Sequence, residues 1–184
     1  MHPALSVIVF TTVSGLGYGL AAVLGLGLLD AAAWPTRIAH VLALAMISTG
    51  LLSSTLHLGN PQRAWRAFSQ WRSSWLSREG VLAVATFVPL TVGAWLSVIE
   101  GRYLPVWGFL GTAGSIATVF STAMIYTSLK SVQAWHTPLT VAGYLSFAAA
   151  GGLTLATVAA YAAGSGVAPA LALAAVVALA AAWA

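Results

Sequence analysis

Residues 103–129 form one uncharged stretch of the chain, YLPVWGFLGTAGSIATVFSTAMIYTSL, bounded by Arg102 and Lys130. A helix needs about 20 predominantly apolar residues to cross the roughly 30 Å hydrocarbon core of a bilayer. The stretch is long enough for one crossing. It therefore predicts a transmembrane helix, which we place at 104–127.

Charged residues divide the rest of the chain in the same way, because the 184 residues include only 7 Lys and Arg and 3 Asp and Glu. The longest uncharged run, 131–184, is interrupted by Gly164-Ser165-Gly166 and Pro169, which are typical of a turn. Each other run is about the length of one membrane crossing. The sequence predicts six helices, the last of them incomplete, at 4–29, 37–58, 80–99, 104–127, 139–163 and 169–184.

The composition indicates an all-α integral membrane protein, a polytopic helix bundle. Only 5% of the residues are charged, whereas a soluble domain has about 25%, which excludes a soluble enzyme and a nucleic-acid binder. In lipid every backbone polar group must be satisfied internally, and the uncharged runs are too long for barrel strands. We expect a single transmembrane bundle over residues 1–184, and further helices after an end that falls inside an apolar run.

Two kinds of redox centre do not fit the sequence. The chain has no cysteine and so cannot ligate an iron–sulfur cluster. His40 and His57 belong to one predicted helix and lie roughly 25 Å apart at 1.5 Å per residue, too far to hold one haem iron between them. We therefore expect neither an iron–sulfur cluster nor a haem in this chain.

The segment 59–79 holds four of the seven basic residues and three of the eight tryptophans. Asn60 followed by Pro61 is a favourable helix start. At 100° per residue, one side carries Trp65, Phe68, Trp71 and Trp75 and the other Arg63, Arg66 and Gln70. We interpret this pattern as a helix in the membrane interface with its aromatic side toward lipid. Arg72 falls among the aromatic residues, so either the helix ends before it or Arg72 has a specific partner.

The two ends of this segment suggest a functional site. His57 closes the second predicted helix and Glu79 opens the third, so both lie at the same membrane face. An ionisable pair at membrane depth indicates a functional site, and His57 and Glu79 can exchange protons with a substrate and with water. A histidine at a helix end equally often binds a headgroup or a backbone group, and that alternative stays open for His57.

Small residues recur at the spacing of helix–helix contacts in two places. Gly15 and Gly19 follow the G-x-x-x-G pattern, and Gly111 and Ser115 repeat the spacing. Such pairs can form a dimerisation face. Close packing within one bundle is the commoner use, and we favour it here.

Several of these stretches resemble the membrane anchor subunit of dimethyl sulfoxide reductase. The most specific is the pattern His-Leu-Gly-x-Pro-x-Arg-Ala at 57–64, and the similarity covers roughly residues 2–145. Around Tyr126 the sequence looks closest to the membrane subunit of the related sulfite dehydrogenase. The matching stretches are His2-Pro3-Ala4-Leu5-Ser6-Val7, His57-Leu58-Gly59-Asn60-Pro61 with Arg63-Ala64, Ser77-Arg78-Glu79, Met124-Ile125-Tyr126-Thr127-Ser128-Leu129-Lys130, and Trp135 with Thr137-Pro138.

In that family the anchor is usually an eight-helix bundle without haem. It exchanges electrons between a membrane quinone, ubiquinone or menaquinone, and an iron–sulfur subunit that connects to a molybdopterin catalytic subunit. The resemblance implies the same partners here, in a complex for sulfite oxidation or sulfoxide reduction whose catalytic centre lies outside this chain. It places the quinone-site histidine at His57, its acidic partner at Glu79 and the loop arginine at Arg63.

The chemistry of quinones agrees with these residues. Two protons accompany two electrons, so a quinone site needs groups that exchange protons close to water. His57 could hydrogen-bond a quinone carbonyl, Glu79 could relay the proton, and Arg63 could polarise the site or hold Glu79.

The basic residues also predict the orientation in a bacterial inner membrane. Five lie at the end of the bundle with loop 59–79, against Arg37 and Arg102 at the opposite end. By the positive-inside rule we expect loop 59–79 in the cytoplasm with the partner subunits docked over it, although the arginines could serve docking alone. The five are Arg63, Arg66, Arg72, Arg78 and Lys130.

Two other functions stay open. In a purely structural anchor without quinone chemistry, His57 and Glu79 would be incidental. A secondary transporter usually places ionisable groups at the membrane midplane between inverted repeats. No charged residue lies in the middle of a predicted span here, which makes transport the weaker alternative.

Overall fold

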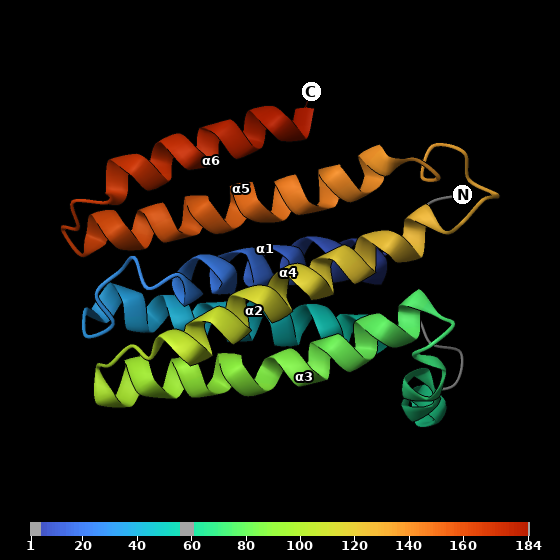
Figure 1. Cartoon of the computed structure of the whole chain (residues 1–184), viewed down its shortest axis with the longest axis horizontal. Coiled ribbons are helices and arrows are strands. Elements are labelled where there is room, and N and C mark those ends of the chain that lie inside the picture. Colours follow the sequence, from blue (N-terminus) through green and yellow to red (C-terminus); the bar gives the residue numbers. More distant parts are fainter. Residues whose placement is uncertain (1–4, 56–60, 184) are drawn as a thin grey trace.

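The computed structural model of the protein describes residues 5–55 and 61–183. Within these ranges the protein is helical throughout (Figure 1), as the composition predicts. A 3₁₀ helix, η1, precedes the third α-helix, and a π-helical turn, η2, continues it. In chain order the elements are α1 (Leu5–Gly25), α2 (Trp34–Thr55), η1 (Pro61–Gln70), α3 (Trp75–Trp95), η2 (Leu96–Glu100), α4 (Pro105–Thr127), α5 (Pro138–Ala162) and α6 (Ala168–Trp183).

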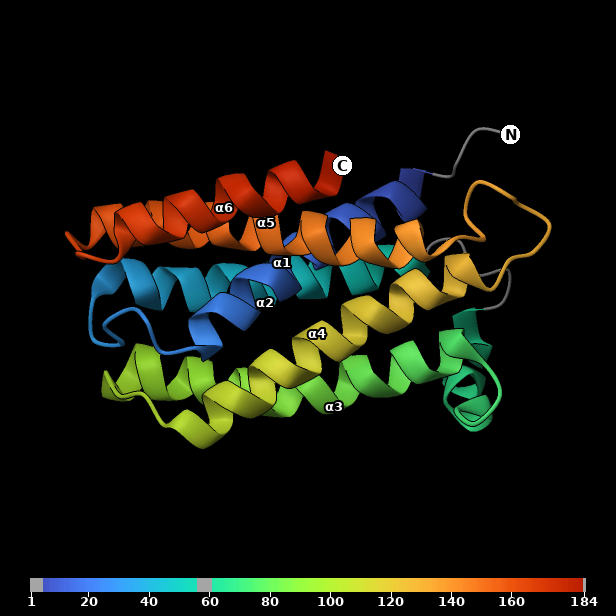
Figure 2. The ribbon, with the colours of Figure 1, turned by 45° about the horizontal axis from the view of Figure 1, so that its top comes forward.

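Helix α1 lies at the centre of the bundle. It packs against α2, α4 and α5, whereas α3 pairs with α4, and α6 pairs with α5. Figures 1 and 2 accordingly show α6 at one edge of the bundle and α3 at the opposite edge. The apolar core forms around α1, where Leu20 is fully enclosed, as is Ile47 on α2.

Five helices have the length and apolar composition to cross a membrane. They are α1, α2, α3 together with η2, α4 and α5, whereas α6 is shorter, with 16 residues. The protein is thus a multi-pass helical membrane protein, and the predicted number of helices is confirmed for the described residues.

Several predicted helix boundaries are wrong. Helix α3 begins at Trp75 and not at residue 80, so Arg78 and Glu79 lie inside it. The prediction began this helix after the last charged residue, but Arg78 bonds the loop backbone from the first turn and Glu79 is buried in the bundle. Helix α1 ends at Gly25 and not at residue 29, because Gly27 adopts a left-handed backbone with φ of 67°.

Helix α2 begins at Trp34, before the predicted start at 37. Pro35 in its first turn needs no backbone N–H partner, which suits a helix start. The described part of α2 ends at Thr55, so residues 56–58 of the predicted helix lie outside the described residues.

The small-residue pairs take different roles in the bundle. A Cβ at Gly19 would collide with the Ala148 carbonyl group on α5, so glycine permits α1 and α5 to approach closely. A Cβ at Gly111 would lie 3.0 Å from the side chain of Leu90, which packs α4 on α3. At Gly15, by contrast, an added Cβ would meet nothing within 4 Å. Close packing within the bundle is therefore confirmed at Gly19 and Gly111, and not at Gly15.

The connections gather at two ends of the bundle, as the charge pattern predicts. The start of α1, η1 and the 128–137 connection lie together at the right-hand end in Figure 1. The connections 26–33, 101–104 and 163–167 lie at the other end. We call the first end the arginine-rich end.

Candidate functional site

Glu79 is a carboxylate buried in the bundle near the arginine-rich end. It lies in the second turn of α3 and is only 6% exposed, whereas Asp30 and Glu100 are exposed. The hydroxyl of Thr122 on α4 donates to Glu79 Oε1 at 3.1 Å. Within the described residues Glu79 is therefore the one buried acidic side chain, fixed between α3 and α4.

The Thr122 hydroxyl lies equally close to a second acceptor, the carbonyl oxygen of Thr118, at 3.1 Å. A hydroxyl has a single proton to donate. It can turn toward Glu79 when the carboxylate is ionised and return to the backbone when the carboxyl group is protonated. Thr122 can thus accommodate both protonation states of Glu79.

Further buried hydroxyl groups continue from Thr122 along the interior of the bundle. Tyr18 on α1 is 3% exposed and lies beside Thr118 and within electrostatic range of Glu79. Its hydroxyl has no hydrogen-bond partner in bonding geometry in the described part of the chain. Thr86 on α3 approaches Thr118 at 3.4 Å between hydroxyl oxygens. We call Tyr18, Thr86, Ser115, Thr118 and Thr122 the hydroxyl cluster.

This cluster was not predicted from the sequence. The signal within one helix was available, because Ser115, Thr118 and Thr122 are spaced by three and four residues and so share one face of α4. That face could have been recognised as a polar stripe facing inward. Tyr18 and Thr86 carried no such signal, since only the packing of α1 and α3 against α4 brings them there.

The loop helix is a 3₁₀ helix and not the α-helix implied by the 100° periodicity. A 3₁₀ helix has three residues per turn, so Trp65 and Phe68 lie on one side of η1, and Trp71 follows directly after its last residue, Gln70. All three side chains are exposed, and an added Cβ at Gly80 would lie 3.4 Å from the Phe68 ring, which places that ring beside α3. The predicted row is therefore confirmed for Trp65 and Phe68 only, because Trp71 follows the end of η1 and Trp75 begins α3; the helix type is corrected.

Arg78 joins this loop to α3. Its Nε donates to the Trp71 carbonyl oxygen at 3.0 Å and its Nη2 to that of Arg72 at 2.7 Å. The guanidinium also lies over the ring of Trp75, 4.3 Å from its centroid. Both explanations offered for Arg72 hold, because η1 ends at Gln70 and the Arg72 guanidinium lies 5.4 Å from the centroid of the Trp71 ring.

The structure leaves the predicted triad of site residues incomplete. Arg63 is exposed on η1, and no ion pair joins it to Glu79 in the described ranges. His57 lies outside the described residues. The roles of His57, Arg63 and Glu79 therefore remain predictions, and the structure adds the burial and the hydrogen bond of Glu79.

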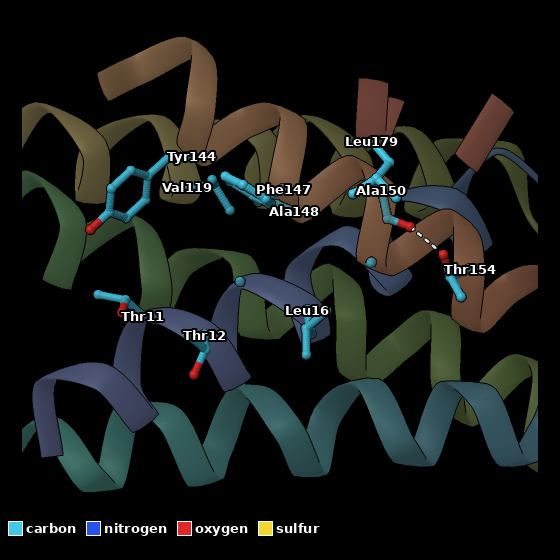
Figure 3. A pocket seen from close by; sticks show the side chains of 12 residues that line it. Thr11, Thr12, Leu16, Val119, Tyr144, Phe147, Ala148, Ala150, Thr154 and Leu179 are labelled. Atoms are coloured by element: carbon cyan, nitrogen blue, oxygen red, sulfur yellow. Dashed lines mark hydrogen bonds between the residues drawn. The ribbon is translucent and has the colours of Figure 1, made fainter. Parts of the chain in front are cut away.

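A cavity of about 450 Å³ lies beside this region (Figure 3), between α1, α4, α5 and α6. We call it the α1–α5 cavity. Glu79 does not line it, but Tyr144 does, and the Tyr144 ring stacks on that of Tyr126 with 5.5 Å between centroids. Tyr126 lies within electrostatic range of Glu79. The two tyrosines therefore bridge the cavity and the region of the carboxylate.

The fold and the site define a class, a multi-pass helical membrane protein with a buried carboxylate near one end and an arginine-rich loop at that end. The chain matches the family described as "DMSO reductase anchor subunit (DmsC)" over residues 1–184, and it belongs to that family. This agrees with the resemblance carried by the loop motif.

Two relatives are similar in sequence. The C subunit of sulfite dehydrogenase from Allochromatium vinosum is 41% identical, over 85% of this chain and 54% of the relative. The C subunit of anaerobic dimethyl sulfoxide reductase from Haemophilus influenzae is 31% identical, over 61% of this chain and 41% of the relative. The chain thus spans about half the length of the curated relatives it matches. No solved structure matches it.

Proposed function

We propose that the protein is the membrane anchor and quinone-reactive subunit of a molybdopterin oxidoreductase complex. It passes electrons between the quinone pool, ubiquinone or menaquinone, and an iron–sulfur subunit. The observation that carries the proposal is Glu79, a carboxylate held inside a membrane bundle by Thr122 at the arginine-rich end. Burying a carboxylate is costly, and ionisable groups in membrane spans mark functional sites.

The proposed reaction requires proton exchange at the quinone. Oxidation of sulfite with water to sulfate releases two electrons and two protons, and a quinone takes up two electrons and two protons to become a quinol. His57 hydrogen-bonds a quinone carbonyl, Glu79 transfers a proton between that site and water, and Arg63 polarises the site. We favour sulfite as the donor because the 41% identical relative is a sulfite dehydrogenase subunit.

The surface at the arginine-rich end supports docking of a partner. Arg63 and Arg66 are exposed on η1, whereas Arg78 is engaged with the backbone of the loop. A partner with an acidic surface fits the exposed arginines by charge complementarity. The positive-inside rule supports a cytoplasmic location for this end in a bacterial inner membrane, with the iron–sulfur subunit on the same side.

The test uses the complete complex purified from membranes. Glu79→Gln keeps the size of the side chain and removes its ability to exchange a proton. We expect quinone-coupled turnover to fall at least tenfold, the lower part of the range for general acid–base catalysis, while dye-coupled activity of the catalytic subunit persists. Equal quinone-coupled turnover in the wild-type and Glu79→Gln complexes would instead show that Glu79 takes no part in quinone chemistry and has a structural role only.

A further inference from the structure

Tyr144, Thr11 and Thr12 lie at one end of the α1–α5 cavity, which we call the polar end. Figure 3 shows Leu179 toward the other end, where the hydroxyl of Thr154 is bonded within its own helix to the Ala150 carbonyl oxygen. Thr11 and Thr12 lie near the start of α1, and Tyr144 lies near the start of α5. Because both helices start at the arginine-rich end, the polar end of the cavity faces that side of the membrane.

The lining selects a neutral amphipathic ligand. No charged side chain lines the cavity within the described residues, so the phosphate of a phospholipid would find no cation there. The remaining walls are largely apolar, including Leu16, Phe147 and Val119. The volume of about 450 Å³ falls within the range of small-molecule sites, roughly 300–1,000 Å³. A quinone ring with an isoprenoid tail has this combination of uncharged carbonyls and apolar bulk.

The polar end also lies next to the proton-exchanging region. Tyr144 stacks on Tyr126 with an angle of 24° between the rings, and Tyr126 lies within electrostatic range of Glu79. Val119 lines the cavity from α4, and three residues further along α4 Thr122 binds Glu79. A quinone ring at Tyr144 would therefore be close to the Glu79 carboxylate without touching it.

We propose that the α1–α5 cavity binds an isoprenoid quinone. Its ring lies at the Tyr144 end, where the tyrosine hydroxyl donates a hydrogen bond to a ring carbonyl, and its tail follows Leu16 and Leu179. The inference rests on the proposed function, which requires a quinone, and it names where in the bundle that quinone lies.

Gly15 gives a direct way to fill the cavity. It lines the cavity, and an added Cβ there meets nothing within 4 Å, so Gly15→Leu introduces bulk without a backbone collision. Gly143 on α5 is a matched control, because its added Cβ is equally free and it does not line the cavity. Both substitutions place leucine in a helix, where it is more favourable than glycine.

The measurement is quinone-coupled turnover of the complete complex with two substrates, decylubiquinone and the same quinone ring without the decyl tail. We expect Gly15→Leu to raise the KM for decylubiquinone about tenfold, equivalent to losing roughly 1.4 kcal/mol of binding. The KM for the tail-less quinone should change much less. Gly143→Leu should match the wild type, and dye-coupled activity should be unchanged in both variants.

Tyr144→Phe tests the ring end. It keeps the stacking on Tyr126 and removes the hydroxyl, so kcat/KM should fall about tenfold for both quinones, the value of one hydrogen bond. A second readout is the quinone extracted from the purified complex, which should decrease in Gly15→Leu and stay constant in Gly143→Leu.

Three results would overturn the assignment of the cavity. The first is an unchanged KM and an unchanged quinone content in Gly15→Leu. If Glu79→Gln still lowers quinone-coupled turnover in that case, the proposed function stays intact and only the cavity assignment fails. The second is retention of phospholipid in place of quinone. The third is failure of the Gly15→Leu complex to assemble, which would show that protein occupies the cavity. Absence of quinone-coupled turnover in the wild type would instead contradict the proposed function itself.

Discussion

Thr122 is the residue through which the structure holds Glu79 in the bundle. Thr122→Val is close in shape and removes the donor, so a buried carboxylate loses its hydrogen bond at a cost of about 1.5–3 kcal/mol. We expect quinone-coupled turnover of the purified complex to fall about tenfold with dye-coupled activity unchanged. Thr157→Val is the matched control, because the Thr157 hydroxyl donates only to the carbonyl oxygen of Leu153 within α5. Equal losses in the two variants would contradict a specific role for Thr122.

The buried hydroxyl of Tyr18 allows a prediction about the stability of the complex. This hydroxyl makes no hydrogen bond in the described part of the chain, so Tyr18→Phe should leave the melting temperature of the complex unchanged or raise it slightly. Tyr103→Phe is the comparison, since the Tyr103 hydroxyl donates to the Gly25 carbonyl oxygen at 2.8 Å and its loss should lower the melting temperature. A lower melting temperature for Tyr18→Phe would show that a buried water binds the hydroxyl.

At the scale of elements, the junction between η1 and α3 depends on Arg78. Its side chain donates to two carbonyl groups of the connection, those of Trp71 and Arg72. Each hydrogen bond contributes about 1 kcal/mol, so losing both raises the population of the opened loop more than tenfold. We expect Arg78→Gln to increase proteolytic cleavage within residues 61–74 about tenfold. Arg66→Gln should not, because the Arg66 guanidinium lies over its neighbour Trp65 within η1.

The elements also show what the sequence could and could not predict. Uncharged runs predicted all six α-helices, because a membrane span must be long and apolar. The helix type of η1 was not predictable from Trp65 and Phe68, since a spacing of three suits both an α-helix and a 3₁₀ helix. Glu79 was predicted as the acidic partner of His57, at the start of the third helix. Its contact with Thr122 depends on the packing of α3 on α4, which the sequence alone does not reveal.

At the scale of the whole molecule, the two ends of the bundle differ in charge and in exposed aromatic surface. Four of the basic residues lie in or beside η1 and the start of α3, and the exposed rings of Trp65 and Trp71 lie there as well. The proposed electron transfer requires the iron–sulfur partner on this side, because the buried carboxylate and the polar end of the cavity both lie toward it. The orientation of the bundle therefore decides in which compartment the catalytic subunit works.

The 184 residues contain no cysteine, so a single introduced cysteine is the one thiol of this stretch and can report the orientation when labelling is read on this subunit. Ser131→Cys lies in an exposed connection at the arginine-rich end, and Gly166→Cys lies in one at the opposite end. A membrane-impermeant maleimide applied to intact cells should label Gly166→Cys in the complete complex, and Ser131→Cys should react only in inverted vesicles, because basic connections stay in the cytoplasm. The reverse pattern would place the partner subunits outside the cytoplasm and would mean that the arginines at this end serve docking and do not set the topology.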